Sequence, residues 1–578
     1  MKKTKIVCTI GPACSREGTI RAMVEAGMNV ARLNFSHGTH AMHAEVFHLL
    51  RRISAEMDAP LAILQDLCGP KIRVGEIPGE GIPIRAGDRI RLTGAPAPCS
   101  PEILSISYPQ LADDLKPGEP VLIEDGLMRL CVEKVQGSEV LCQVQVGGLV
   151  KSHKGVNFPD SRLHVSAMTE KDREDALFGL KLGVDFIALS FVRRPEDLAE
   201  LRQLLAAERR AVPVLAKIEM RDAIEHLEAI LTAADGAMVA RGDLGVESPL
   251  EQVPLVQKEI IRICNRMSKP VITATQMLDS MIRNPTPTRA EVSDVANAIL
   301  DGTDAVMLSG ETATGQYPVE AVSMMSRICR AAEVLLHSRP SPEYSFPRNV
   351  VNSISEATCR MSAELGAGGI VVLTDSGRTA RLMSRYKPKA PILAVTRTAE
   401  ARRRLALSWG VFPLLAGPEE ADDFLTAGVT PLALRSGLVS TGDLVVITAG
   451  LPVSAKGSTN AIQVEVLGHV FLRGHGVGPA VRRTGRVFLA EGTGQALGRL
   501  EEGDVLVLKR LEAPLLSSET RPAALVTEEG GEGSFAESYC RRLEIPGILN
   551  VPDATRTLIH GGQIGLDSGR GILYRIEE

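Results

Sequence analysis

The sequence predicts an α/β protein whose largest part is a closed (β/α)8 barrel of the TIM type. From the N-terminus to about residue 340, eight short apolar runs typical of buried strands alternate with longer helical patterns. Polar side chains follow most of these runs, and such barrels carry their chemistry at the carboxyl ends of the strands. The whole chain of 578 residues has room for about three or four domains.

The expected barrel strands are apolar and rich in β-branched residues. In chain order they are Ile6–Ile10, Val30–Phe35, Leu61–Leu67, Phe186–Phe191, Val212–Ile218, Gly236–Ala240, Val271–Thr275 and Ala305–Ser309. The expected helices repeat apolar residues at helical spacing, and they are Arg16–Ala26, His43–Met57, Pro195–Glu208, Asp222–Ala234, Leu250–Met267, Thr288–Leu300 and Pro318–Leu336.

Three further domains are expected around this barrel, which would comprise residues 1–68 and 166–345. Residues 69–165 change to short strand-like stretches with Gly/Pro turns, which predicts a small all-β lid over the barrel mouth that excludes water during chemistry. Strand and helix patterns alternate again over residues 346–470, which predicts an open α/β domain. Residues 474–578 are rich in glycine and strand formers, with a polar stretch near Leu515–Arg521, and predict a β-rich tail domain.

Composition excludes several classes of protein. The formal net charge of −5 gives no basic surplus for binding nucleic acid. No apolar run is long enough to predict a membrane span, and the N-terminus lacks the apolar stretch of a secretory signal. The ten cysteines are scattered without a CxxC pair, which is typical of reduced thiols. We therefore expect a cytoplasmic protein.

Two neighbouring strand ends carry a charged set suited to phosphate chemistry. Lys217 and Glu219 stand two residues apart, so the strand period points both the same way, and Asp243 follows the next strand. Two such carboxylates suit Mg²⁺ or Mn²⁺, and a lysine beside them suits phosphoryl charge. A strand-end salt bridge would use the same residues, and these residues alone leave both interpretations open.

Other strand ends of the predicted barrel add polar residues at the same rim. These residues are Arg32, Asn34, Ser36, Asp66, Thr275, Ser309 and Glu311. Because the carboxyl ends of parallel barrel strands meet at one face, this gathering favours an active site over isolated salt bridges.

A second candidate site follows the strand Gly369–Leu373. Its residues are Thr374, Ser376, Gly377, Arg378 and Thr379, which form a hydroxyl-rich turn and a helix start. Backbone N–H groups, hydroxyls and a guanidinium there would hold a phosphate. An ordinary N-capped helix would use the same residues, so the turn alone leaves both readings open.

Seven motifs in residues 3–470 resemble those of the pyruvate kinase family. They occur in the family's order at residues 8–12 (CTIGP), 31–38 (ARLNFSHG), 69–73 (GPKIR), 217–219 (KIE), 241–245 (RGDLG), 274–277 (ATQM) and 308–312 (LSGET). The resemblance implies transfer of the phosphoryl group of phosphoenolpyruvate to ADP in glycolysis, giving ATP and pyruvate.

The resemblance also implies roles for individual residues. Glu219 and Asp243 would hold the divalent ion, and Lys217 would neutralise the transferring phosphoryl group. Arg32 and Arg73 would grip phosphate oxygens by two-pronged hydrogen bonds. The remaining assignments are Arg241 and Gly242 for the substrate carboxylate, Thr275 beside the methylene group, Asn34 and His37 with Arg73 on the nucleotide side, and Ser309 and Glu311 as proton relay candidates.

Regulation and assembly follow from the resemblance as well. The turn Thr374–Thr379 matches the family's effector-phosphate loop, with Lys387 and Lys389 nearby, so we expect activation by a sugar phosphate or AMP. The family forms homotetramers, and a symmetric assembly suits coupling between an effector site and the barrel.

The run Asp66–Lys71 departs from the family pattern Asp-Thr-Lys-Gly-Pro-Glu, because Lys71 replaces the glutamate. Its ammonium would supply the charge that K⁺ otherwise brings beside the phosphates. The oxygens of the family's K⁺ pocket are still present, at Asn34, Ser36, Asp66 and the Leu67 carbonyl. The sequence therefore predicts an enzyme that does not require K⁺.

The tail departs from its own relatives. Residues 474–578 resemble the mobile domain of phosphoenolpyruvate-utilising enzymes, whose phosphorylated histidine lies in Gly-Gly-Leu-Thr-Ser-His. This chain reads Gly530-Gly531-Glu532-Gly533-Ser534-Phe535, with Phe535 at the histidine position. We expect a structural or regulatory tail.

Two other functions remain to be weighed at this point. A metal-dependent enolate lyase or aldolase on a TIM barrel would share Glu219 and Asp243, but it would not need Lys217 over a phosphoryl group or Arg73 in the lid. A metabolite sensor without activity would not need the intact catalytic positions. Formation of ATP separates the kinase from both.

Overall fold

The computed structural model describes residues 1–336, 349–417, 429–450, 459–468, 470–492, 499–512 and 521–576. By contacts the chain divides into two compact units. The first is Met1–Arg348 with Thr374–Lys389 and Thr398–Pro413, and the second is Asn349–Leu373 with Ala390–Arg397 and Leu414–Glu578. The predicted boundary between residues 345 and 346 lies outside the described residues, and the division into four domains stays a prediction.

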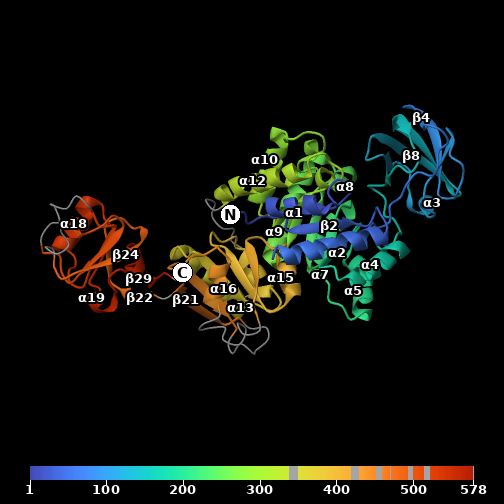
Figure 1. Cartoon of the computed structure of the whole chain (residues 1–578). Helices are drawn as coiled ribbons and strands as arrows, with labels where there is room; N and C mark the ends of the chain where they lie inside the picture. Colours follow the sequence, from blue (N-terminus) through green and yellow to red (C-terminus); the bar gives the residue numbers. More distant parts are fainter. Residues whose placement is uncertain are drawn as a thin grey trace. The chain divides into compact units, whose positions relative to one another are not determined.

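Within residues 1–336 a closed barrel of eight parallel strands confirms the predicted fold class (Figure 1). Its strand order is β1-β16-β15-β14-β13-β12-β3-β2. The strands are β1 (Lys5–Thr9), β2 (Val30–Asn34), β3 (Ala62–Asp66), β12 (Phe186–Leu189), β13 (Val214–Ile218), β14 (Gly236–Ala240), β15 (Val271–Ala274) and β16 (Ala305–Leu308). Each lies within two residues of its predicted position.

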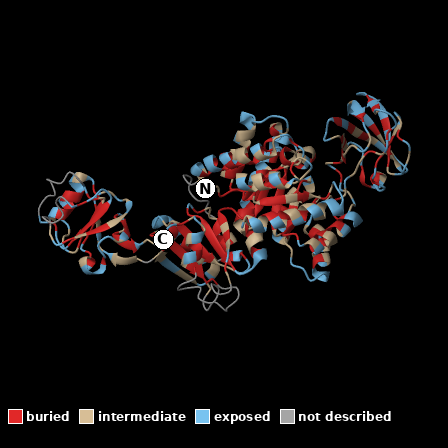
Figure 2. Ribbon diagram, viewed as in Figure 1, coloured by how far each residue is buried: buried red, intermediate tan, exposed pale blue. Residues whose placement is uncertain are grey.

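Side chains alternate along these strands between two apolar cores. Val7, Leu64 and Ile272 belong to a cluster built mainly from strand residues, which fills the barrel interior. Their neighbours Ile6, Ile63 and Val271 pack against residues of the surrounding helices. Figure 2 shows these strands as buried, with the exposed residues on the outer faces of the helices. Burial on both faces explains why the strands are apolar throughout.

The helices around the barrel include all the predicted ones, with shifted ends. They are α1 (Glu17–Ala26), α2 (His40–Glu56), α5 (Pro195–Ala207), α6 (Arg221–Glu225), α7 (Leu227–Ala233), α9 (Val253–Met267), α10 (Arg289–Leu300) and α12 (Pro318–Leu336). The predicted helix Asp222–Ala234 is divided at His226 into α6 and α7.

One long helix, α4, and several short elements were not predicted. These are α4 (Glu170–Leu182), α8 (Arg241–Glu247), α11 (Gly310–Ala313), η1 (Leu250–Gln252) and η2 (Asp279–Ile282). The two glycines of α8 disfavour a helix by propensity, so only the tertiary structure places Asp243 in a helical first turn.

The inserted residues form β-structure with their own core, as predicted. A sheet of order β11-β7-β8-β9-β5-β6 accompanies the pair β10-β4. The elements are β4 (Ile82–Ile84), β5 (Arg89–Thr93), β6 (Ile103–Ser105), α3 (Leu111–Asp114), β7 (Pro120–Ile123), β8 (Met128–Gln136), β9 (Glu139–Val146), β10 (Gly148–Val150) and β11 (Val156–Asn157). Leu92, Leu130 and Val140 are fully buried between these strands.

The predicted α/β part contains a sheet of order β19-β18-β17-β20-β21. Its elements are α13 (Val350–Glu364), β17 (Gly369–Leu373), α14 (Arg378–Ser384), β18 (Ile392–Thr396), α15 (Ala399–Leu405), β19 (Val411–Leu415), α16 (Val429–Arg435), β20 (Leu444–Ala449) and β21 (Ala461–Val466). Strand β19 was not predicted, and it contains Pro413, which an edge strand tolerates.

The tail is β-rich, as predicted. Its described residues form a sheet of order β22-β29-β28-β24-β25-β26-β27-β23. The elements are β22 (Val470–Arg473), β23 (His475–Val477), β24 (Arg482–Ala490), β25 (Asp504–Leu508), β26 (Ala524–Thr527), α18 (Phe535–Leu543), β27 (Gly547–Leu549), α19 (Ala554–Thr557), β28 (Gln563–Asp567) and β29 (Ile572–Arg575). Phe535 opens α18 and is 43% exposed. The polar stretch near Leu515–Arg521 lies largely outside the described residues.

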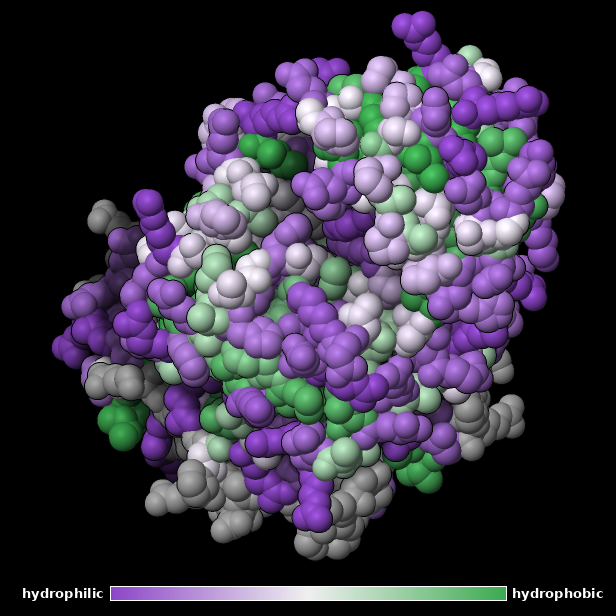
Figure 3. Space-filling model, turned by 90° about the vertical axis from the view of Figure 1, so that its right-hand side faces the viewer, coloured by the Kyte–Doolittle hydropathy of each residue, from purple (hydrophilic) through white to green (hydrophobic). Residues whose placement is uncertain are grey.

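The described helices give no sign of a membrane span, because none of them is both long and apolar enough to cross a bilayer. On the face drawn in Figure 3, hydrophilic residues predominate and apolar residues lie in patches between them.

Candidate active site

Four of the predicted residues meet at the carboxyl ends of β2, β3 and β13. Arg32 Nε donates to Asp66 Oδ2 at 2.6 Å. The Lys217 Nζ atom lies 3.5 Å from Asp66 Oδ1 and 3.4 Å from Glu219 Oε2. The side chains of Asp66 and Glu219 are 1% exposed. Two cations and two carboxylates thus alternate in a nearly closed site.

Burial and charge act in opposite directions on these groups. Burial would raise the pKa of Asp66, but Lys217 and Arg32 hold it below its usual value. Burial alone would lower the pKa of Lys217, and the carboxylates of Asp66 and Glu219 raise it instead. Lys217 therefore stays charged at neutral pH.

The pKa of Glu219 is raised to about 7, because burial and the charge of Asp243 outweigh the attraction of Lys217. Its Oε1 accepts a hydrogen bond from the Phe191 N–H at 2.6 Å. Its Oε2 is buried and has no hydrogen-bond partner among the described residues. The Lys217 ammonium lies 3.4 Å from this oxygen without a hydrogen bond, and a buried carboxylate oxygen that lacks hydrogen bonds is costly unless a metal ion completes its surroundings.

The donor set fits a divalent metal ion of the magnesium type. Asp243 stands in the first turn of α8 and is exposed to the pocket described below. No group of three or more His, Cys, Asp or Glu side chains with metal-binding geometry occurs in the described ranges. Glu219 and Asp243 provide two hard oxygen ligands, which suits an ion that keeps water or substrate oxygens in its other positions.

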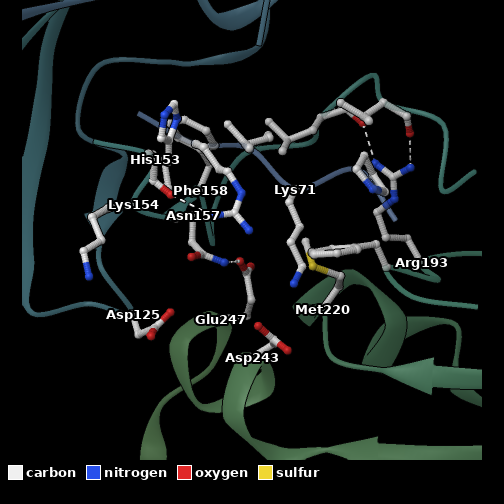
Figure 4. A pocket seen from close by; sticks show the side chains of 18 residues that line it. Lys71, Asp125, His153, Lys154, Asn157, Phe158, Arg193, Met220, Asp243 and Glu247 are labelled. Carbon is white, nitrogen blue, oxygen red and sulfur yellow. Dashed lines mark hydrogen bonds between the residues drawn. The ribbon is translucent and has the colours of Figure 1, made fainter. Parts of the chain in front are cut away.

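A pocket of about 270 Å³ opens between the inserted residues and the barrel (Figure 4). Lys71 from the insertion and Asp243 and Glu247 from α8 point into it. Arg73 also lines it, and its Nη1 donates to the His153 carbonyl at 2.8 Å. Basic and acidic groups therefore face each other across this space.

Sequence reasoning missed two contacts at this pocket. Asn157 Nδ2 donates to Glu247 Oε1 at 2.7 Å, and burial raises the pKa of Glu247 to about 7. Arg193 donates to the carbonyls of Leu163, at 2.8 Å, and Val165. Glu247 lies four residues after Asp243, so in a helix the two side chains share one face. This spacing would have indicated Glu247 as a pocket residue if α8 had been predicted.

The guanidinium of Arg241 is turned away from the charged cluster. It donates to the carbonyl of Thr275 at 2.7 Å and pairs with Asp294 at 2.7 Å. Thr275 has a φ of 69°, so this contact holds a backbone conformation that β-branched residues avoid. Gly242 is required beside it, because an added Cβ would lie 2.8 Å from Thr275 Cγ2.

Glu311 is likewise turned into the protein. Its carboxylate accepts hydrogen bonds from the backbone N–H groups of Leu278, at 3.0 Å, and Ser309, at 2.7 Å. Burial raises its pKa. This geometry makes Glu311 a support for two backbone segments, and it gives no support to the predicted proton relay.

The residues expected around K⁺ stand at the carboxyl ends of β2 and β3 or directly after them. Asn34 Oδ1 accepts a hydrogen bond from the Ser36 N–H at 3.1 Å, and the Leu67 carbonyl accepts one from Ser190 at 2.7 Å. His37, which was expected on the nucleotide side, has its backbone carbonyl 2.8 Å from His43 Nε2.

The predicted effector turn has the expected order of strand, turn and helix. Gly377 has a φ of 75° and precedes α14, and its N–H donates to Thr374 Oγ1 at 3.0 Å. The Arg378 N–H donates to Ser376 Oγ at 3.4 Å. Lys387 is turned elsewhere, because its Nζ pairs with Asp304 at 2.9 Å. These hydrogen bonds are local to the turn, and phosphate binding stays a prediction.

A parallel barrel with buried cations and carboxylates at its carboxyl rim is typical of an enzyme that binds an anionic substrate with a divalent metal ion. Three family models match the chain, described as pyruvate kinase, barrel domain (residues 1–322), pyruvate kinase, alpha/beta domain (352–465), and PEP-utilising enzyme, mobile domain (500–571). The chain belongs to the pyruvate kinase family.

Individual relatives agree over nearly the full length. The chain is 45% identical to pyruvate kinase 2 of Synechocystis sp., covering 99% of this chain and 97% of that protein. It is 44% identical to the pyruvate kinase of Geobacillus stearothermophilus, covering 99% of both. The crystal structure of a pyruvate kinase from Cryptosporidium parvum superposes with a TM-score of 0.76 at 35% identity, covering 81% of this chain and 96% of that one.

These findings confirm the resemblance seen in the motifs, including that of the tail. The protein is an enzyme of this family, whose members act on phosphoenolpyruvate and ADP with a divalent metal ion. Membership of this family favours a kinase over the lyase and sensor interpretations.

Proposed function

We propose that the chain transfers the phosphoryl group of phosphoenolpyruvate to ADP, with Mg²⁺ or Mn²⁺ held by Glu219 and Asp243. The observation that carries this is the buried Lys217 ammonium between two carboxylates at the barrel rim. When bound, the metal ion neutralises charge on the phosphoryl and enolate oxygens.

Lys217 stabilises the transferring group because its charge is fixed before the substrate arrives. The equatorial oxygens gain negative charge in the loose transition state of phosphoryl transfer, and a buried ammonium acts there in a low dielectric. Arg32 is oriented by its bond to Asp66 and by a bond of Nη1 to Thr9 Oγ1 at 2.9 Å. Because Nε and Nη1 are held by these bonds, the orientation of the guanidinium is fixed before phosphate oxygens bind to it.

The substrate carboxylate is proposed to bind backbone N–H groups at Arg241 and Gly242, where α8 begins. Thr275 lies against Gly242, with its backbone held by Arg241. This contact supports a position of Thr275 beside the reacting end of a substrate bound at α8, where the enolate would take up its proton. We propose Arg73 with Asn34 and His37 for the nucleotide side.

The experiment that tests this function is steady-state ATP formation from phosphoenolpyruvate and ADP with Mg²⁺. We expect ATP and pyruvate in equal amounts and no activity after chelation of the metal. Cleavage or rearrangement of an enolate substrate without ATP would support the lyase alternative instead. No product under any condition would overturn the proposal.

Activity is expected not to require K⁺. Lys71 lines the pocket with Asp243, which supports the proposal that its ammonium takes the place of a monovalent cation near the phosphates. We expect wild-type turnover to change less than about twofold on adding KCl, and Lys71→Glu to become stimulated about tenfold or more. Both are measured in buffer free of K⁺ and Na⁺. Tenfold stimulation of the wild type by KCl, unmatched by a bulky organic cation, would contradict this account.

A sugar phosphate or AMP is proposed to activate the enzyme through the turn Thr374–Thr379. Arg378→Ala is expected to abolish activation, because it removes the guanidinium of a phosphate site, and to leave the basal rate within about twofold. The panel is glucose 6-phosphate, ribose 5-phosphate, fructose 1,6-bisphosphate and AMP. Arg360→Ala is the control, since this exposed arginine pairs with Glu364 on its own helix. Unchanged activation of the Arg378 variant would refute the site.

The assembly and setting of the enzyme are proposals of the same kind. We propose a homotetramer in the cytoplasm, with residues 69–165 as a lid, residues 346–470 as the effector domain and residues 474–578 as a structural or regulatory tail. Family membership supports the assembly, and Phe535 at the start of α18 supports a tail without phosphohistidine chemistry.

A further inference from the structure

We propose that Ser190 is a positioning residue for phosphoryl transfer, which holds the Lys217 ammonium through its hydroxyl and ties it to the Leu67 carbonyl. The inference rests on the proposed function. Ser190 directly follows β12 and is 1% exposed. Its Oγ lies 2.7 Å from Lys217 Nζ and 2.7 Å from the Leu67 oxygen.

The chemistry of the two partners fixes the direction of both hydrogen bonds. An ammonium only donates, so the Ser190 oxygen accepts from Lys217. A carbonyl only accepts, so the Ser190 hydroxyl donates to Leu67. The single proton of the hydroxyl is therefore committed to Leu67, and a lone pair is left facing Lys217.

The register of the barrel strands places Ser190 between these groups. Leu189 of β12 is the partner of Ala216 in β13, so the next residue of each strand brings Ser190 beside Lys217. On the other edge, Ala188 is the partner of Asp66 in β3, which brings the end of β12 level with Leu67. The contact is thus a consequence of the closed sheet.

Ser190 orients the Lys217 ammonium by a hydrogen bond, while the Asp66 and Glu219 carboxylates neutralise its charge. The ion pairs of Lys217 with Asp66 and Glu219, at 3.5 and 3.4 Å, are longer than a good hydrogen bond. Lysine has a flexible four-carbon chain, and fixing its end before the reaction avoids reorganisation at the moment of transfer. Ser190 provides the short bond of 2.7 Å that these ion pairs lack.

The end of β12 also holds the second functional side chain of β13. Phe191, the next residue, donates its N–H to Glu219 at 2.6 Å. Gly69 packs against this corner, since an added Cβ would lie 3.0 Å from Ser190 Cβ and 2.5 Å from the Phe191 ring. The corner is closely packed and hydrogen-bonded, which is what positioning requires.

The Leu67 carbonyl belongs to the expected monovalent-cation pocket, so Ser190 connects that pocket to Lys217. One hydroxyl thus lies between the Leu67 carbonyl and the Lys217 ammonium.

The test compares Ser190→Thr with Ser190→Val, which have the same shape and differ by the hydroxyl. We expect Val, like Ser190→Ala, to lower kcat about 10- to 100-fold with the phosphoenolpyruvate KM changed less than about threefold. Thr restores most of this loss. Thr303→Val is the structural control, because Thr303 precedes β16 at the amino end of that strand and the change removes a buried hydroxyl that lies 3.0 Å from Thr273 Oγ1. This variant is expected to lower Tm and leave kcat unchanged.

A double-mutant cycle separates positioning from a general packing effect. In the Lys217→Met background, Ser190→Ala is expected to cost less than about twofold, because its target is gone. Equal kcat for the Thr and Val variants, or an undiminished loss in the Lys217→Met background, would overturn the role of Ser190 alone. A wild-type enzyme that forms no ATP would instead overturn the proposed function and this inference with it.

Discussion

Replacing Lys217 with methionine is expected to lower kcat for ATP formation by about a thousandfold or more, the scale seen when a cation on a transferring phosphoryl group is removed. Methionine keeps most of the length and volume of the side chain, so the change isolates the charge. The Lys217 side chain is 13% exposed, and its ammonium lies between Asp66 and Glu219, which keep it charged in the resting protein.

The loss is not expected to come from unfolding. Asp66 keeps its bond to Arg32 after the change, and Glu219, whose pKa is raised to about 7, takes up a proton at little cost. Thermal melts therefore accompany the kinetics, and kcat is referred to folded protein. Lys258→Met is the control, since this lysine lies on the outside of α9 and pairs with Asp301. A Lys217→Met enzyme with more than about a tenth of the wild-type kcat would contradict the assignment.

The barrel was predictable because its signal is local. Strands buried on both faces must be apolar, and runs such as Gly236–Ala240 are short, apolar and followed by polar residues. The strand period also placed Lys217 and Glu219 together, and the structure separates their charged atoms by 3.4 Å. The features that depend on the periodicity of the sequence, the strands and the Lys217–Glu219 pair, were therefore predicted correctly.

The parts that escaped prediction depend on strand register and on side-chain direction. Ser190 gave no sign of its contact, because its partners Leu67 and Lys217 come from different strands far along the chain. The inward turn of the Glu311 carboxylate and the rotation of Arg241 toward Thr275 are set by neighbouring backbone groups. Residue type indicates that such side chains are polar, and only the fold decides what they contact.

Replacing Glu219 with glutamine is expected to weaken Mn²⁺ binding and to lower kcat/KM by about a hundredfold or more at fixed metal concentration, because a carboxylate ligand becomes a neutral amide. The amide keeps the shape of the side chain. Its NH₂ group cannot serve as a ligand, and an NH₂ at the Oε2 position would face the Lys217 ammonium 3.4 Å away. Direct Mn²⁺ titration of the protein without substrate measures the binding change apart from turnover.

The pH dependence of Mn²⁺ binding makes this test specific to Glu219. Its pKa is raised to about 7 in the metal-free protein, so above that pH the carboxylate is charged and available to the ion. Below it the ion must displace a proton, and the apparent affinity of the wild type is expected to fall by up to about tenfold per pH unit. The Glu219→Gln protein, which has no proton to displace there, is expected to bind weakly with a flatter pH profile, whereas Glu228→Gln, an exposed control paired with Arg266, should match the wild type. Wild-type Mn²⁺ affinity in the Glu219→Gln protein would show that the Glu219 carboxylate is not a ligand of the metal ion, because the loss of a carboxylate ligand must weaken binding.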